Sequence, residues 1–136
     1  MALAAEALVR KRLTQAELDV ICAKHDRLFQ ARPGGARAVF AWMDLSGLRL
    51  RGRNLADADF AAARLHGCDL SGAKLDNANF FGADMQDINL TEASLRRADL
   101  RGACLRGAVL VGANLFEADL RDGSLAEKDR SGHLHM

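Results

Sequence analysis

The sequence predicts an all-β solenoid, in which the chain winds into a four-sided coil and a preceding helix covers one end. Two observations lead to this fold class. Every fifth residue from Leu45 to Leu125 is a large apolar side chain. In the same register, aromatic residues recur every 20 residues as Phe40, Phe60 and Phe80. Together these patterns predict a β-helix of about four coils with an N-terminal α-helical cap.

A period of five residues fits neither a straight helix nor a straight strand. Five residues of α-helix rotate by about 500°, which would scatter the apolar side chains around the helix axis. In a strand, successive residues point to opposite faces, so every second member of the apolar series would face the wrong way. The chain must therefore turn a corner in every pentad, which makes each pentad one side of a polygon.

The phenylalanines indicate how many sides the polygon has. Like side chains stack on like between coils at little packing cost, so a 20-residue recurrence predicts four pentads per coil. The predicted interior columns are 45/65/85/105/125, 50/70/90/110, 55/75/95/115 and 40/60/80/100/120.

Glycine marks many of the predicted corners, two residues after the apolar centre of the pentad. It stands there at Gly47, Gly52, Gly67, Gly72, Gly82, Gly102, Gly107 and Gly112. Glycine permits the positive φ that a type II turn needs at its third residue. Where Asp57, Asn77, Arg97 or another side chain takes this place, we expect type I corners. An Asp or Asn just before the centre is expected to hydrogen-bond local backbone.

The same pentads carry a recognisable motif, a small residue followed by Asp or Asn and then Leu or Phe. It reads Ala58-Asp59-Phe60, Ala78-Asn79-Phe80, Ala98-Asp99-Leu100, Ala113-Asn114-Leu115 and Ala118-Asp119-Leu120. This pattern resembles that of the pentapeptide-repeat proteins, of bacterial type with an N-terminal helical cap. The resemblance covers about residues 38 to 125. It implies a right-handed quadrilateral β-helix with a narrow, dry core.

Ahead of the repeat, residues Leu13 to Ala31 predict one amphipathic helix. Thr14 and Glu17 are spaced as the N-cap and third residue of a capping box, and Pro33-Gly34-Gly35 ends the segment. The predicted apolar stripe consists of Leu18, Ile21, Cys22, Leu28 and Phe29. Since the first coil has an open edge, we expect the helix to lie over it as a cap. His25 lies near the stripe and is expected to be a hydrogen-bonded residue at the cap border.

The chain divides into an N-terminal helical capping segment at 1–37, a pentapeptide-repeat β-helix at 38–125 and a polar tail at 126–136. Its 136 residues suit a single domain, and no apolar run approaches the roughly 18 residues of a membrane span. A signal peptide is not expected, because the basic residues follow the short apolar start. Three cysteines without paired spacing favour a reducing cytoplasm.

Residues that could carry catalysis do not form a pattern. The sequence holds no glycine-rich phosphate loop and no Cys-x-x-Cys zinc pair. His133 and His135 lack nearby partner ligands, and carboxylates on a solenoid form outer ladders rather than a convergent pocket. We therefore expect no enzyme, no cofactor and no metal site.

The C-terminal end of the repeat lacks a second cap, because the tail after Leu125 has no apolar stripe. Either two copies meet there as a homodimer, or the chain continues in a longer protein that covers the end. Apolar residues occupy outward positions nearby, and Trp42 and Phe81 do so elsewhere, where the N-terminal segment or a neighbouring side chain is expected to cover them. The predicted association surface is Val109, Val111, Leu115, Phe116 and Leu125.

A basic cluster near the first coils is a second candidate contact, for an acidic protein partner. It consists of Arg49, Arg51, Arg53 and Arg64. Arg53 stands where the repeat expects a small interior residue, so its side chain should swing outward or pair with a carboxylate. Stacking aromatics do not interleave with these residues, so direct nucleic-acid binding is not expected.

The predicted function is a protein-protein interaction scaffold or regulatory binding module, built on a rigid rod that is about 20 Å long at the usual strand spacing. An alternative comes from the family resemblance, since some members look like B-form DNA and bind type II topoisomerases such as gyrase. That mechanism requires a strongly acidic rod. Residues 40–125 hold 12 acidic and 10 basic residues, a net charge of −2, and the whole chain carries +1. The near-neutral charge disfavours DNA mimicry.

Overall fold

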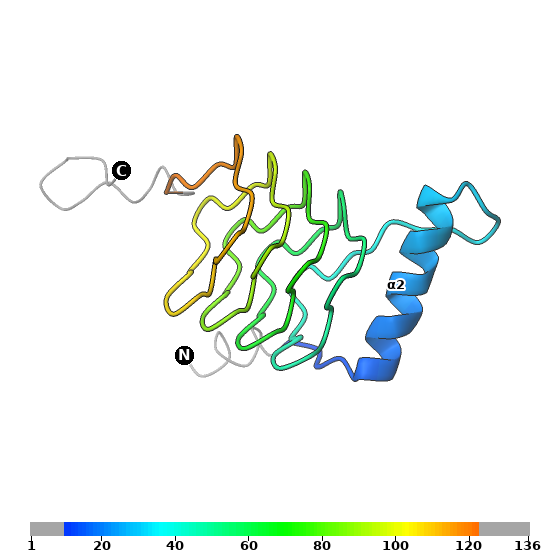
Figure 1. The fold of residues 1–136 in the computed structure, drawn as a ribbon. Helices are drawn as coiled ribbons and strands as arrows, with labels where there is room; N and C mark the ends of the chain where they lie inside the picture. The colour runs from blue at the N-terminus through cyan, green and yellow to red at the C-terminus, as the bar shows by residue number, and fades with distance from the viewer. Residues whose placement is uncertain (1–9, 123–136) are drawn as a thin grey trace, which may run out of the picture.

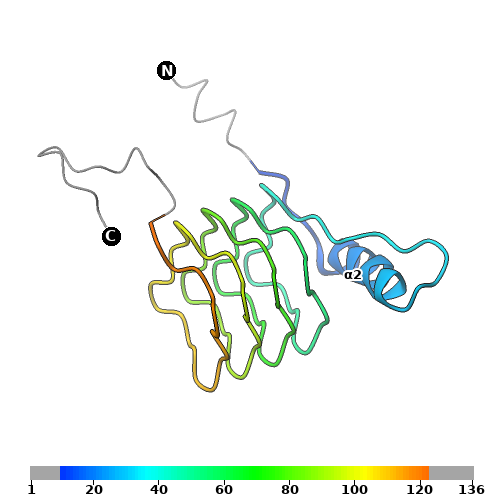
Figure 2. The same cartoon turned by 90° about the horizontal axis from the view of Figure 1, so that it is seen from above.

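The computed structural model describes residues 10–122, which form a stack of coils with one helix across the first end (Figure 1). This helix, α2, spans Gln15–Phe29. Seen from above, the coils follow one another along one axis, and α2 lies beside the earliest of them (Figure 2). The architecture is a quadrilateral β-helix with an N-terminal helical cap, so the predicted fold class is confirmed.

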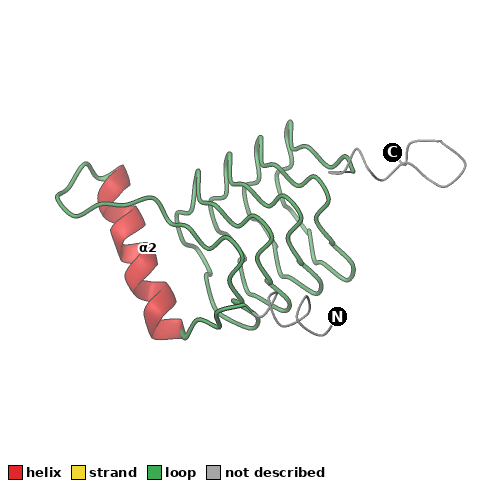
Figure 3. Cartoon of the chain, turned by 180° about the vertical axis from the view of Figure 1, so that it is seen from behind, coloured by secondary structure: helices red, strands yellow, loops and turns green. Residues whose placement is uncertain are grey.

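Adjacent coils pair through parallel bridges with an offset of 20 residues. On one side of the rod, Val39 pairs with Asp59, Asp59 with Asn79, Asn79 with Asp99, and Asp99 with Asp119. The other three sides repeat this arrangement. Within residues 10–122 each bridge is isolated and none extends into a strand, so the coils are drawn as loop in Figure 3. The constant offset confirms four pentads per coil.

Backbone hydrogen bonds explain why one bridge per side suffices. The N–H of Leu70 donates to the carbonyl of Asn89 at 2.8 Å, and the N–H of Gly72 donates to Thr91 at 2.8 Å. The N–H of Ala73, the small residue that starts the next pentad, donates back to Leu70 at 3.1 Å and closes the turn. Centre, corner and small residue are therefore all bonded in each inner pentad, which leaves few polar backbone groups unpaired.

The corners all share one geometry, and the expectation of type I corners is wrong. Every corner residue from 42 to 117 has a positive φ, including Asp57 at 65°, Asn77 at 61° and Arg97 at 57°. Corner N–H groups also bond the next coil, as that of Asp57 does with Asp76 at 2.9 Å. Because this bond is needed at each step, the register imposes the type II corner on whichever residue stands there. A residue other than glycine that is held at such a positive φ costs roughly 1–2 kcal/mol in conformational free energy.

The Asp and Asn residues before each centre support the corner that follows. The Oδ1 atom of Asp59 accepts the N–H of Ala61 at 2.9 Å, and that of Asn79 accepts the N–H of Phe81 at 2.9 Å. Their predicted structural role is confirmed. An Oδ1 atom that accepts the backbone N–H of its own turn in this way is already engaged and is less available to a ligand.

The interior holds the predicted columns at full burial through the inner coils. Phe40, Phe60 and Phe80 are completely buried, and their rings stack with centroids 5.1 and 4.8 Å apart. Cys68 takes a small interior position and donates its thiol to the carbonyl of Leu45 at 2.9 Å. Burial raises the pKa of the Cys68 thiol to about 12, so this cysteine is a packing residue.

Helix α2 begins as predicted and ends earlier. The Oγ1 atom of Thr14 accepts the N–H of Glu17 at 3.1 Å, and Glu17 accepts the N–H of Thr14 at 2.9 Å, which completes the capping box. The helix stops before Pro33 because the chain reverses and Gly35 returns against the last turn. A Cβ on Gly35 would lie 2.5 Å from the backbone nitrogen of Leu28. Only glycine allows this close approach.

The buried face of α2 differs in part from the predicted stripe. Leu18 and Cys22 are buried as expected, and His25 joins them with no exposed surface. Leu28 and Phe29 were expected in the stripe, but they are 45% and 46% exposed. The face that meets the coil follows the i, i+4, i+7 spacing of the first three residues, and the last turn points away from it.

Polar side chains of α2 satisfy the open edge of the first coil. The Nδ1 atom of His25 accepts the N–H of Ala38 at 2.9 Å, and its Nε2 atom bonds the carbonyl of Ala56 at 2.9 Å. Gln15 donates to the carbonyl of Arg49 at 2.8 Å and accepts its N–H at 2.9 Å. The predicted cap and the structural role of His25 are confirmed.

Substitution of Ala62 by glycine should stabilise the protein, because Ala62 holds a corner φ of 56° that glycine adopts without steric cost. We expect the Ala62→Gly variant to gain about 1 kcal/mol in the free energy of unfolding, measured by urea denaturation.

The neighbouring variant Ala61→Gly serves as the control, because residue 61 is not among the positive-φ positions. Here glycine should cost roughly 0.5–1 kcal/mol through backbone entropy. Equal effects of the two variants would contradict the proposed corner strain.

Candidate functional site

Apolar side chains gather on the outside of the last described coil. Val109 is 43% exposed, Val111 is 70% exposed and Phe116 is 54% exposed. In the preceding coil the corresponding positions of the two valines hold Asn89 and Thr91, which are polar. The predicted outward placement of these residues is confirmed. We call Val109, Val111, Leu115 and Phe116 the last-coil surface.

The end of the rod adds interior side chains to this surface. Leu115 is only partly buried, although the same column is fully buried at Leu75 and Leu95. Leu120 was expected in an interior column, but it is 55% exposed. Both residues lie where no further coil within residues 10–122 covers the core. Leu125, the remaining predicted member, lies outside the described residues.

Charged groups border the last-coil surface, and two of them form an ion pair. The guanidinium of Arg96 lies 5.4 Å from the ring centroid of Phe116. Beside it Arg97 pairs with Glu117 at 2.9 Å, and both side chains are more than half exposed. A partner would therefore meet an apolar centre with a polar rim, as protein interfaces commonly have.

The predicted basic cluster is only partly available for a partner. The guanidinium of Arg53 pairs with the carboxylate of Asp19 on α2 at 2.6 Å. The expected pairing of Arg53 with an acidic residue is thereby confirmed. Its guanidinium connects helix α2 to the coil and is not free to bind a partner. Arg49, Arg51 and Arg64 are exposed on the first coils. Sequence reasoning could not identify Asp19 as the partner of Arg53, because the two residues lie 34 positions apart in the chain.

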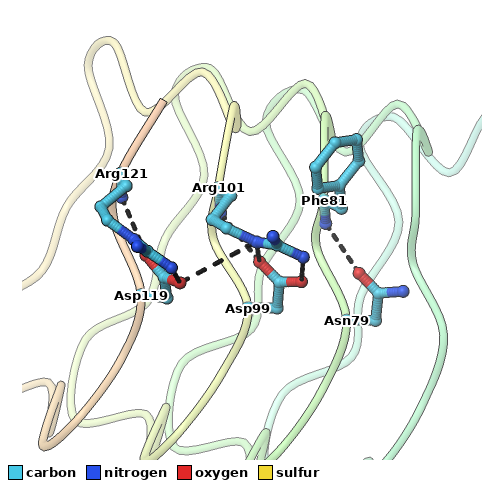
Figure 4. A network of polar contacts seen from close by, with 6 residues as sticks. All are labelled: Asn79, Phe81, Asp99, Arg101, Asp119 and Arg121. Carbon is cyan, nitrogen blue, oxygen red and sulfur yellow. Dashed lines mark hydrogen bonds and ion pairs between the residues drawn. The ribbon is translucent and has the colours of Figure 1, made fainter. Parts of the chain in front are cut away.

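A ladder of Asp–Arg pairs occupies another side of the rod (Figure 4). Arg101 donates two hydrogen bonds to Asp99, of 2.9 and 2.8 Å. Arg121 donates two hydrogen bonds to Asp119, of 3.0 and 2.8 Å. Arg101 also approaches Asp119 at 3.9 Å. Hydrogen bonds from Arg121 lower the pKa of Asp119 to about 2. These arginines are committed to their own carboxylates, so the ladder offers little free charge.

The same side carries two outward aromatic residues nearer the cap. Trp42 is 58% exposed with the guanidinium of Arg10 at 5.4 Å from its ring centroid. Phe81 is 38% exposed, and Arg101 lies over its ring at 5.2 Å. The expected cover by neighbouring side chains is present in both places, and a large part of each ring stays accessible.

Neither a metal-binding cluster nor a membrane-spanning helix is present among the described residues. No group of three His, Cys, Asp or Glu residues among 10–122 could hold a metal ion. The pair His133 and His135 lies outside this range. Across the same residues, α2 included, no helix has the length and apolar character needed to span a bilayer.

Comparison with known proteins identifies the repeat. A family model described as pentapeptide repeats matches residues 36–72, 44–80, 73–112 and 93–127, in eight copies. A search of curated proteins returns no match.

Solved structures support the same relationship. A pentapeptide repeat protein of the Arabidopsis thaliana thylakoid lumen is 36% identical with a TM-score of 0.62, over 63% of this chain and 60% of that one. The plasmid-mediated fluoroquinolone resistance protein QnrB1 is 27% identical with a TM-score of 0.57, over 60% and 43%. A pentapeptide repeat protein from Nostoc Pcc 7120 is 25% identical with a TM-score of 0.53, over 93% and 88%. The chain thus spans less than two thirds of the first two proteins.

Removal of Arg121 should return the pKa of Asp119 from about 2 toward its ordinary value of 3.8, since Arg121 is the main cause of the shift. An NMR titration of the Asp119 carboxyl group in wild type and in Arg121→Met measures this. Because the folded pKa is lowered, the stabilisation is present above the ordinary value and is lost as pH falls toward 2.

Asp69 offers the internal control for this titration, because the hydrogen bonds that lower its pKa come from Ser71. Its titration should be unchanged in Arg121→Met. An Asp119 carboxyl that titrates identically in both proteins would show that the paired geometry does not persist in solution.

Proposed function

The chain belongs to the pentapeptide-repeat family, and on that premise we propose that it is a non-enzymatic protein-binding scaffold that associates through the last-coil surface. The pentapeptide repeats account for the rod-shaped β-helix. The choice of surface rests on one observation, the exposed apolar residues on the last described coil, of which Val111 is 70% exposed. Large exposed apolar patches on soluble proteins commonly mark interaction sites.

The two ends of the rod differ, and this difference supports the choice. At the first end, α2 supplies His25 and Gln15 to the edge of the coil. At the other end, the described residues contain no cap, and Leu120 is 55% exposed. Burying such side chains in an interface stabilises the complex by roughly 25 cal/mol per Å² of apolar surface before the costs of association.

A second copy of this chain is the partner that we propose for this surface. Contact between two identical ends satisfies a two-fold axis, the commonest symmetry of soluble oligomers. It also covers the open edges of both last coils at once, and open edges are otherwise liable to aggregate. The outward faces of the inner coils would remain available to further protein partners.

DNA mimicry receives less support from the faces of the rod. QnrB1 is named a fluoroquinolone resistance protein, but it shares 27% identity and this chain covers 43% of it. Acidic groups on the ladder side are neutralised in place, as Asp99 is by Arg101 and Asp119 by Arg121. Such pairing leaves only a weak electrostatic potential at a distance from the rod, whereas a rod that mimics DNA needs a strongly negative potential. We therefore do not propose a topoisomerase as the target.

The cytoplasm stays our predicted compartment. Cys22, Cys68 and Cys104 are free thiols, and burial raises the pKa of Cys22 to about 11. Unpaired cysteines suit a reducing environment. One similar structure comes from a thylakoid lumen protein, so similarity alone does not select the compartment.

A glutamate at Val111 should weaken self-association, because a carboxylate would be desolvated in the interface. We expect light scattering across a dilution series to show a dimer for wild type. The Val111→Glu variant should raise the dissociation constant at least about tenfold, or about 1.4 kcal/mol.

The variant Val20→Glu is the matched control, since Val20 is 56% exposed on α2 at the other end of the rod. It should dimerise like wild type. A wild-type chain that is monomeric throughout and unaffected by the change at Val111 would refute the proposed surface.

A further inference from the structure

The described part of the chain carries its positive charge at the capped end. Residues 10–75, which include α2 and the first coils, hold 12 basic and 7 acidic residues. Residues 76–122 hold 5 basic and 8 acidic residues. The capped half therefore has a net charge of +5 and the other half one of −3. Because opposite charges attract, the capped half favours an acidic partner.

Exposed apolar side chains lie on the ladder side of this half. Val39 and Trp42 on the first coil are 47% and 58% exposed, and Phe81 is 38% exposed. Ala61 and Ala62 lie between them and are half-buried. The bridges of this side place these residues in consecutive coils. We call these five residues the first-coil patch.

Two arginines stand at the corners that bound this side of the rod. The Nε atom of Arg37 donates to the backbone carbonyl of Asp57, which is the corner residue before the side. The guanidinium of Arg10 donates to the carbonyl of Ala62, the corner residue after it, and lies 5.4 Å from the ring centroid of Trp42. Each of these hydrogen bonds uses one of the five N–H donors of a guanidinium. Donors of both arginines are therefore left for a carboxylate.

The charge of these two arginines is not neutralised in place. Neither Arg10 nor Arg37 forms an ion pair with another residue among 10–122. In contrast, Arg101 beyond the patch is paired with Asp99 at 2.8 Å (Figure 4). Within positions 39–42, 59–62 and 79–82 of this side, Asp59 is the only carboxylate, and its Oδ1 atom accepts a backbone N–H. The first-coil patch is thus an apolar strip with an unpaired positive group at each corner.

We propose that the first-coil patch binds an acidic segment of another protein. Its apolar side chains pack against Val39 and Trp42, and its carboxylates pair with Arg37 and Arg10. One side of the rod is five residues, at most about 17 Å, so carboxylates three to five residues apart in an extended segment reach both corners. Arginine–carboxylate hydrogen bonds are about twice as strong as neutral ones, and Trp and Arg contribute most at protein interfaces. This surface is separate from the last-coil surface.

An anionic lipid bilayer is the other partner that exposed tryptophan and arginine side chains commonly meet. A flat bilayer would contact the whole side at once, and it would bring Asp59 and the carboxylates of the ladder against its own negative headgroups. A protein segment contacts only the strip between Arg37 and Arg10. The mixed charge of this side therefore favours the protein segment.

Isothermal titration calorimetry with synthetic peptides tests the proposal. Each peptide has a Leu-Phe centre and two Glu residues placed three, four or five positions apart, and in its control Lys replaces Glu. We expect at least one Glu peptide to bind about tenfold or more tightly than its Lys control. Binding should also shift the emission of Trp42, the only tryptophan in the chain, to shorter wavelength as its ring leaves water.

Single substitutions locate the binding on the patch. Arg37→Ala and Arg10→Ala each remove one carboxylate partner and should raise the dissociation constant of the Glu peptide about five- to tenfold. Arg51→Ala is the matched control, because Arg51 is exposed on another side of the first coil and its loss changes the net charge equally. Both Arg51→Ala and Val111→Glu should bind the peptide like wild type. Urea denaturation of each variant verifies that the β-helix is intact.

Four results would overturn the proposal. Glu peptides that bind no tighter than their Lys controls would exclude an acidic segment. An equal loss of affinity in Arg37→Ala and Arg51→Ala would indicate a general effect of net charge. A shift of Trp42 emission with phosphatidylglycerol vesicles but with no peptide would assign the patch to lipid. A shift that grows with protein concentration alone would assign it to a second copy. Dimerisation at the last coil is measured separately with Val111→Glu.

Discussion

The pairing of each coil with the next at an offset of 20 residues is the constraint on which the rest of the structure depends. Two N–H groups per inner pentad, at the centre and at the corner, donate to the following coil. That requirement fixes where the chain turns, and the turn fixes which side chains face inward. Gly67 and Arg97 both have a positive φ, of 69° and 57°, although only glycine adopts it without steric cost. The pairing register therefore sets the backbone conformation of the corner even where the side chain opposes it.

The two ends of the rod follow from the same constraint. A coil edge carries donors and acceptors that the next coil would satisfy, so each end needs a substitute. At the first end the substitute comes from side chains, as His25 joins Ala38 and Ala56, and from residues 11–13. At the last coil the described residues provide none, and interior leucines such as Leu120 become surface. The proposed function is therefore located at the coil whose edge no other residue among 10–122 covers.

The sequence predicts the fold well because its period is visible without tertiary information, and Thr14 with Glu17 marks the helix start equally clearly. It fails at the corners, since residue preference at Asn77 cannot reveal the coil-to-coil bond that selects the turn. It fails for Leu28 and Phe29 because the face of a helix is decided by what it packs against. Outward apolar residues such as Val111 could be predicted from the repeat, but the grouping around Trp42 depends on the position of Arg10, which only the structure gives.

Native-state amide hydrogen exchange, followed by NMR, tests the central role of coil pairing most directly. The N–H groups of Leu70 and Gly72 bond the following coil, whereas those of Leu110 and Gly112 occupy the same column and corner without a following coil among residues 10–122. In the monomer, Leu70 and Gly72 should exchange only through global unfolding, and Leu110 and Gly112 at least about 100-fold faster. Equal protection of the two pairs would contradict the account, because stability would then not depend on one coil being covered by the next.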